Sequence, residues 1–195
     1  TPYKIHPNNP MLIVAGYDEV YRSYFGGDVS PNFNSWDSIS YNVSGGQSIK
    51  TIALAPSNED YIYVATHTRL KVTVDGGSTW ENIKPGLPNY NITDVVVSDQ
   101  NPDHLWVSFS EYNSSHKVYE SIDRGATWVN ITGLNLPNLP VNCITHQKGL
   151  TTDEIYIGTD VGVYHKNNTM ADWIPFMNGL PNVTVRELEI HYGQG

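Results

Sequence analysis

A tryptophan recurs along this chain at nearly regular intervals. The positions are Trp36, Trp80, Trp128 and Trp173, separated by 44, 48 and 45 residues. Gly-Leu-Pro-Asn follows at 86–89 and again at 179–182, with the related Gly-Leu-Asn-Leu-Pro-Asn at 133–138. A shared tail behind three of these tryptophans indicates an internal repeat, and a period of about 40 to 50 residues is typical of propeller blades.

Each period contains the same succession of strand and turn signals. In the second period, β-rich runs at 49–54 and 61–66 flank a polar turn, a third run ends at Val74, and a short fourth run surrounds Trp80. This order predicts a four-stranded antiparallel meander. One such sheet leaves a face uncovered, whereas stacked copies bury both faces, so the sequence predicts an all-β fold, a β-propeller. A β-sandwich is the alternative, but it does not require the turns to recur in phase.

The repeats set the expected domain organisation, a single propeller. We expect blade 1 at 1–48, blade 2 at 49–90, blade 3 at 91–139, blade 4 at 140–182, and the first strand of a further blade at 183–195. Most propellers close with six or more blades, so the chain is expected to be part of a ring of about six to eight blades. A closed four-bladed ring is the alternative, and it requires 183–191 to pair with 3–5.

Two turns share the pattern Ser/Thr-x-Asp-x-Gly-x-Thr-Trp. Their defining residues are Thr73, Asp75, Gly77, Thr79 and Trp80 in one, and Ser121, Asp123, Gly125, Thr127 and Trp128 in the other. The aspartate can accept hydrogen bonds from its own hairpin, the glycine can take positive φ, and the tryptophan can cover the apolar side. These residues are therefore predicted to be structural and not catalytic.

This pattern resembles the Asp-box, or BNR, repeat. Similar boxes are found in sialidases, xyloglucan-cleaving glycoside hydrolases, sortilin-type receptors, a photosystem assembly factor and large secreted proteins of Bacteroidetes. The resemblance implies a propeller with the boxes on its outer rim, away from the ligand site, and a secreted or cell-surface bacterial protein. The first and fourth repeats depart from the pattern: an insertion follows Asp28, and Asn168 and Met170 replace the aspartate and glycine.

Charge and composition exclude several classes of function. The net charge is −9 and the basic residues are scattered, which argues against nucleic acid and a polybasic membrane site. No apolar run is long enough to span a bilayer. Cys143 and His146 would point to opposite faces of one strand, and one aspartate per turn is too few for calcium. No metal and no cofactor are therefore expected, and Cys143 is predicted to be an inert buried thiol.

Enzyme signatures are sparse. No two acids can be paired across a sugar from sequence, and the nucleophile elbow and zinc motifs are absent. A sialidase needs three arginines around a carboxylate, whereas the chain has only Arg22, Arg69, Arg124 and Arg186, with Arg124 in a turn. The predicted function is a non-catalytic extracellular scaffold or binding module. The alternative is a fragment of a glycoside hydrolase of the xyloglucanase or sialidase-like propeller type.

Loops at one end of the expected channel supply candidate ligand contacts. They contain Tyr17, His67, Asn89, Tyr90, Tyr112 and Asp160. Aromatic and amide groups together suit glycans or peptides. Possible N-glycosylation sites are Asn42, Asn91, Asn113, Asn130, Asn167 and Asn182. The expected partners are protein segments that complete the ring, and glycans.

Overall fold

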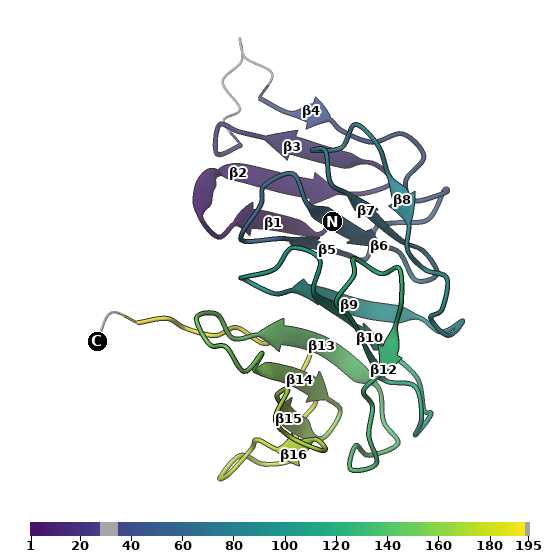
Figure 1. Cartoon of the computed structure of the whole chain (residues 1–195), viewed down its shortest axis with the longest axis vertical. Coiled ribbons are helices and arrows are strands. Elements are labelled where there is room, and N and C mark those ends of the chain that lie inside the picture. Colours follow the sequence, from purple (N-terminus) through teal and green to yellow (C-terminus); the bar gives the residue numbers. More distant parts are fainter. Residues whose placement is uncertain (28–34, 194–195) are drawn as a thin grey trace.

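The computed structural model of this chain describes residues 1–27 and 35–193. Within these residues the regular secondary structure consists of sixteen strands in four sheets, which confirms the all-β prediction. The sheets follow one another along the long axis of the molecule (Figure 1). The predicted insertion of the first repeat, from Asp28 onward, falls mostly outside the described residues.

Every sheet is a four-stranded meander in chain order. The first comprises β1 (Tyr3–His6), β2 (Asn9–Gly16), β3 (Val20–Ser23) and β4 (Asp37–Ser38). The second comprises β5 (Thr51–Leu54), β6 (Ile62–Ala65), β7 (Leu70–Thr73) and β8 (Glu81–Asn82). The third comprises β9 (Ile92–Val97), β10 (Leu105–Phe109), β11 (Val118–Ser121) and β12 (Val129–Asn130). The fourth comprises β13 (Val141–His146), β14 (Ile155–Thr159), β15 (Gly162–Lys166) and β16 (Ile174–Pro175).

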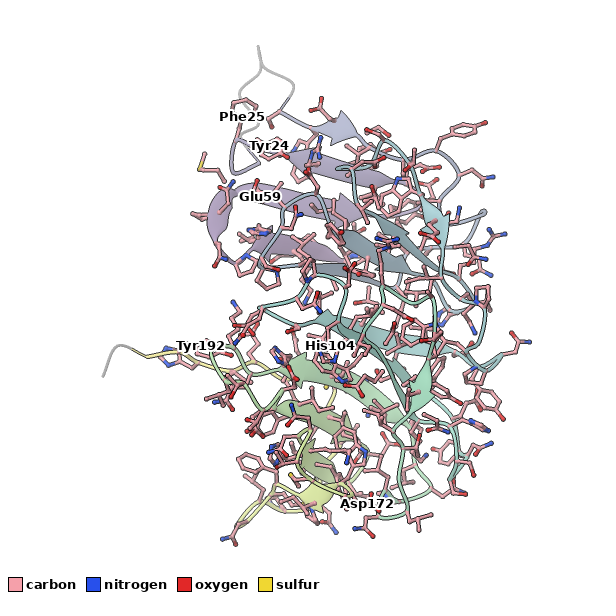
Figure 2. The ribbon with its side chains drawn as sticks, in the orientation of Figure 1. Tyr24, Phe25, Glu59, His104, Asp172 and Tyr192 are labelled. Atoms are coloured by element: carbon pink, nitrogen blue, oxygen red, sulfur yellow. The ribbon has the colours of Figure 1, made fainter. Side chains whose placement is uncertain are left out.

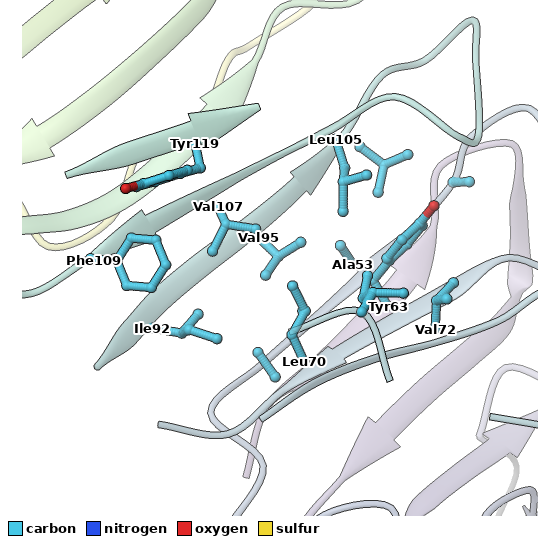
Figure 3. Close-up of a cluster of buried hydrophobic side chains, with 14 residues drawn as sticks. Ala53, Tyr63, Leu70, Val72, Ile92, Val95, Leu105, Val107, Phe109 and Tyr119 are labelled. Carbon is cyan, nitrogen blue, oxygen red and sulfur yellow. The ribbon is translucent and has the colours of Figure 1, made fainter. Parts of the chain in front are cut away.

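The core lies between successive sheets. One cluster of buried side chains joins Ala53, Tyr63 and Leu70 of the second sheet to Ile92 and other residues of the third (Figure 3). Similar clusters join the first sheet to the second and the third to the fourth. All four residues of β6 are buried, because both faces of the second sheet are covered. This radial stacking is the arrangement of part of a β-propeller.

The innermost strands β1, β5, β9 and β13 lie next to one another and face a cleft of about 450 Å³. The two outermost sheets each leave one face open. On the first sheet Tyr3, Ile5 and Met11 are 66%, 52% and 50% exposed, and on the fourth Phe176 is 57% exposed. Apolar side chains therefore remain accessible at both ends of the stack.

The tail (residues 183–193) runs beside β13 in an extended path without strand assignment. The Val185 amide donates to the Thr159 carbonyl at 2.8 Å, and the Asn142 side chain donates to the Val185 carbonyl at 3.1 Å. Further along, the Lys148 amide donates to the Tyr192 hydroxyl at 2.7 Å. Figure 2 shows Tyr192 far from the first sheet, and the described part of β1 pairs with β2 alone. A role for the tail as the first strand of a further blade stays a prediction.

Candidate functional site

The 73–80 turn joins β7 to β8 and is held together by one carboxylate. Asp75 Oδ1 accepts from the Thr79 amide at 2.8 Å and from Thr73 Oγ1 at 2.7 Å, while Oδ2 accepts from Thr79 Oγ1 at 2.7 Å. The Gly77 amide donates to Thr73 Oγ1 at 2.8 Å. The hydrogen bonds from Thr79, followed by that from Thr73, lower the pKa of Asp75 to about 2.

The 121–128 turn between β11 and β12 repeats this geometry. Asp123 accepts from the Thr127 amide at 2.8 Å, from the Thr127 hydroxyl at 2.5 Å and from Ser121 Oγ at 2.7 Å. The bonds from Thr127 are the main reason that the pKa of Asp123 is lowered. Each carboxylate accepts three hydrogen bonds within its own hairpin, which fits a structural role for both aspartates.

The periodic tryptophans connect neighbouring sheets. Their indole Nε1–H groups donate to backbone carbonyls of the preceding sheet: Trp80 to Ile39 at 2.9 Å, Trp128 to Ile83 at 3.0 Å and Trp173 to Ile131 at 2.8 Å. Sequence reasoning expected the tryptophan to cover its own hairpin and missed this contact. The nearly regular spacing of the three donors, 48 and 45 residues, was the signal that could have indicated it.

The predicted ligand loops lie at one end of the stack. In each meander the second strand ends at this end, and the first strand of the following sheet begins there. Tyr17 and Tyr112 are 60% and 69% exposed. The Tyr17 and His67 carbonyls accept the amides of Ile49 and Ile92 at the start of the next sheet. Within the described chain, no hydrogen bond joins any two of the six predicted contact residues, and their role in ligand binding stays a prediction.

Two of the six predicted contact residues belong to local networks instead. Asp160 accepts from the Asn142 side chain at 3.0 Å beside the tail. Asn89 is exposed, and the next residue, Tyr90, is partly buried against the loop between β10 and β11. The Tyr90 hydroxyl accepts from Asn113 Nδ2 at 2.9 Å, which links the second sheet to that loop.

We define the β10–β11 loop site as Tyr90, Asn113, His116 and Tyr119. The His116 ring centroid lies 6.0 Å from that of Tyr90, and His116 Nδ1 is 2.5 Å from the Tyr119 hydroxyl. A pocket of about 320 Å³ adjoins the same loop and is lined by Ser114, Ser115, Asn130, Thr132, Gly133 and Leu134. The site therefore combines aromatic rings with hydroxyl and amide groups.

Lys117 fixes this loop, and sequence analysis did not single it out. Its side chain is fully buried, and Nζ donates to the Leu139 carbonyl at 2.6 Å and to the Glu111 carbonyl at 3.1 Å. Burial lowers the pKa of Lys117. A lysine in a polar stretch reads as a surface residue, so its burial follows only from the packing of two loops around it.

Asp94 lies on the wall of the central cleft, which Glu187 and Glu189 of the tail also line, and it joins three inner strands. It accepts from Thr51 Oγ1 of β5 at 2.7 Å, from the Val95 amide at 2.9 Å and from the Ile144 amide of β13 at 3.3 Å. Burial raises the pKa of Asp94 in spite of these bonds. Nearby, burial raises the pKa of the Cys143 thiol to about 11, as suits a thiol without nucleophilic reactivity.

Two further properties bear on the expected partners. In residues 1–27 and 35–193, no set of three or more His, Cys, Asp or Glu side chains is arranged to hold a metal ion. The same residues contain no helix that is long and apolar enough to cross a membrane.

Comparison with known proteins links this geometry to propellers. No protein-family model matches the chain. A xyloglucanase of Hypocrea jecorina (strain QM6a) is 28% identical over 127 residues, which are 63% of this chain and 15% of that protein. The structure of an ancestral GH74 enzyme superposes with a TM-score of 0.67 at 18% sequence identity, and the match covers 90% of this chain and 23% of the GH74 chain. The structure of YCF48 bound to D1 peptide superposes with a TM-score of 0.56 at 12% identity, and the match covers 89% of this chain and 55% of the YCF48 chain.

These similarities support the fold as a partial β-propeller of four-stranded blades. The chain spans less than two thirds of each protein it matches: 15% of the xyloglucanase, 23% of the GH74 enzyme and 55% of YCF48. At 12–18% identity the structural likeness concerns the arrangement of sheets and not the residues of a site.

Proposed function

We propose that this chain is part of a secreted or cell-surface propeller of the Asp-box type that binds a hydroxyl-rich ligand, a glycan, at the β10–β11 loop site. The observation that carries the proposal is that His116, whose ring lies 6.0 Å from that of Tyr90, is 3.5 Å from Asn130, which lines the pocket together with Ser, Thr, Gly and Leu residues. Sugars are recognised by such a combination, since a ring covers their apolar face while amides and hydroxyls bond their oxygens.

The loop is also held in place before any ligand arrives. Lys117 bonds two carbonyls at its base, Asn113 bonds Tyr90, and Asn130 Nδ2 donates to the Ser115 carbonyl at 2.6 Å. A loop fixed in this way loses less conformational entropy on binding than a mobile one does. The xyloglucanase similarity supports a glycan as the ligand class.

The alternative is a fragment of a glycoside hydrolase, favoured by the same similarity. Asp75 and Asp123 are engaged in their turns and give this alternative no support. Asp94 holds three inner strands, and Glu187 and Glu189 of the tail line the same cleft. A glycosidase needs two carboxylates facing one sugar, so this cleft is where the alternative would place its acids.

We further propose that additional sheets complete the ring. The Phe176 amide donates to the Val163 carbonyl at 2.8 Å, as Ile39, Ile83 and Ile131 donate to the third strands of their own sheets at 2.9–3.0 Å. The carbonyls of Ile39, Ile83 and Ile131 each accept an indole N–H from the following sheet. The Phe176 carbonyl occupies the equivalent position in the fourth sheet. Phe176 is 57% exposed here, so radical footprinting of the native protein should find it covered. Full reactivity of Phe176 there would reject ring completion at this face.

Calorimetric titration with xyloglucan, β-glucan and sialylated oligosaccharides tests the binding proposal. Tyr90→Phe removes the hydroxyl that bonds Asn113, and His116→Ala removes a ring. Each is expected to weaken binding about tenfold, as is usual for a central contact. Tyr41→Ala is the matched control, since Tyr41 is 94% exposed and lies in another loop. Binding that is unaffected by both site variants rejects the site.

Incubation with the same polysaccharides separates binding from catalysis. A binding module releases no sugar. Release that is abolished by one carboxylate substitution, such as Asp94→Asn, would instead support the glycoside hydrolase alternative.

A further inference from the structure

A buried histidine lies where the third and fourth sheets meet. His146 is the last residue of β13, and its side chain is 2% exposed. Its ring is stacked on the indole of Trp106 from β10, with centroids 5.1 Å apart and planes 16° apart. His104, labelled in Figure 2, contacts the same indole at 4.2 Å. We use the name seam for the cluster that consists of His104, Trp106, His146, Asp99, Glu120 and Asp153.

The described residues of the seam leave His146 Nε2 without a hydrogen-bond partner. Its Nδ1 lies 3.8 Å from Asp99 Oδ1 and its Nε2 lies 3.7 Å from Asp153 Oδ1, both beyond hydrogen-bond length. Among the described residues, His146 Nε2 and Asp99 Oδ1 are buried polar atoms without a partner. A buried polar atom that lacks a partner costs free energy and calls for a physical explanation.

Other ionisable groups in the seam already have partners. His104 Nε2 is 2.9 Å from Glu120 Oε1, which also accepts from Trp106 Nε1 at 3.0 Å. His104 Nδ1 faces Asp153 Oδ1 at 3.9 Å. Lys166 lines a small cavity beside Glu120 and Asp153, and its Nζ donates to the Met170 carbonyl at 2.5 Å. On the cleft side, Lys148, Arg186, Glu187 and Glu189 share a wall with His146, and Glu154 beside the paired strand β14 is bonded to His165.

Protonation would place a cation in this enclosed position. The Trp106 indole covers one face of the imidazole, and the second imidazole of His104 adds positive charge when it is protonated. Asp99 and Asp153 attract the cation from ion-pair distance, although at 3.8 Å and 3.7 Å both lie beyond hydrogen-bond length. Burial outweighs that attraction and lowers the pKa of His146. An imidazolium is better solvated when the two sheets separate.

We propose that His146 makes the packing of the fourth sheet on the third sensitive to pH, so that mildly acidic solution opens the seam. The sign follows from linkage: a histidine kept neutral in the closed seam stabilises it fully above the ordinary pKa, and that stability falls as the pH drops below it. For an open-state pKa of about 6.5, the opening equilibrium rises at most about tenfold between pH 7.5 and 5.5.

One backbone amide reports on the seam directly. The Gly149 amide, from the loop after β13, donates to Asp99 Oδ2 of the third sheet at 2.9 Å. Its hydrogen exchange in the full chain, corrected for the intrinsic effect of pH, should lose up to about tenfold in protection between pH 7.5 and 5.5. The Ile83 amide, bonded to the Leu70 carbonyl in the second sheet, is the internal reference and should not change.

His146→Phe is the decisive variant, because a phenyl ring can stack on Trp106 but does not titrate. Loss of the pH effect at Gly149 in this variant supports the proposal. Protection that is constant or rises in acid in the wild type, or that falls equally in the variant, overturns it. Should the variant fail to fold, the NMR titration of the His146 ring in the wild type decides: a midpoint below about 6.5 supports the proposal and one at or above it does not.

Discussion

The indole of Trp128 donates to the carbonyl of Ile83 in the neighbouring sheet at 3.0 Å. Trp80 and Trp173 make the same bond one sheet before and one sheet after. The tryptophan period in the sequence therefore marks contacts between sheets. Trp173 keeps its bond although Asn168 and Met170 replace the aspartate and glycine of its turn, so the contact does not require the full turn pattern.

Trp128→Phe should destabilise the fold by about 1–3 kcal/mol, because the ring still packs while the Ile83 carbonyl loses its donor inside an interface. Urea denaturation of the wild type and the variant measures this difference. Tyr112→Phe is the control, since Tyr112 is 69% exposed in a loop. An unchanged unfolding midpoint for Trp128→Phe would show that the indole bond contributes nothing.

The glycine of the 121–128 turn lies directly against the neighbouring sheet. Gly125 has φ +84°, and a Cβ there would lie 2.7 Å from Ile83 Cβ. Gly149 has a similar φ of +80°, with open space around a Cβ. Gly149→Ala should therefore lower the free energy of unfolding by only about 1–2 kcal/mol, the cost of placing alanine at positive φ. Gly125→Ala should lower it by about 1–3 kcal/mol more, because the added methyl group clashes with Ile83.

Thermal unfolding of the two alanine variants under identical conditions separates these terms. Equal melting temperatures would mean that Ile83 moves away at no cost and that the close approach of the two sheets is unimportant.

Acid should weaken the 73–80 turn over a defined range. Because the pKa of Asp75 is lowered from 3.8 to about 2, its carboxylate stabilises the fold above pH 3.8 and loses this effect as the pH falls towards 2. Asp75→Asn lacks the charge at every pH. The melting temperature of the wild type should exceed that of the variant at pH 5, and the gap should narrow towards pH 2. A constant gap would contradict the assignment.

Local regularities in the sequence predicted the meanders and the hydrogen bonds within the turns. Asp75 and Thr79 lie four residues apart in one hairpin, so a short stretch of sequence is enough to predict their contact. Contacts between distant segments were not visible in this way. The burial of Lys117 and the pairing of Tyr90 with Asn113 depend on how neighbouring sheets place their loops. The six loop residues named as ligand contacts stay a prediction, because a ligand site depends on the same placement of loops by neighbouring sheets.

The six possible glycosylation sites should divide into two sets when the chain is secreted from a eukaryotic host. Glycosylation consumes one hydrogen of the asparagine amide and needs free space around it. In the folded chain Asn113, Asn130 and Asn167 donate through Nδ2 to Tyr90, Ser115 and Glu154. The other set consists of Asn42, Asn91 and Asn182, which are exposed, as Asn130 of the first set is too.

A glycan on any of the three bonded asparagines would crowd a side chain that holds a loop, so molecules carrying it should be depleted during secretion. We therefore expect glycan occupancy, measured by peptide mapping of secreted protein, to be high at Asn42, Asn91 and Asn182 and low at the other three. Tyr90→Phe provides a sharp check, because it frees the Asn113 amide without altering the acceptor motif. Occupancy at Asn113 should rise in that variant and stay unchanged at Asn167, and equal occupancy at all six sites in the wild type would disprove the division.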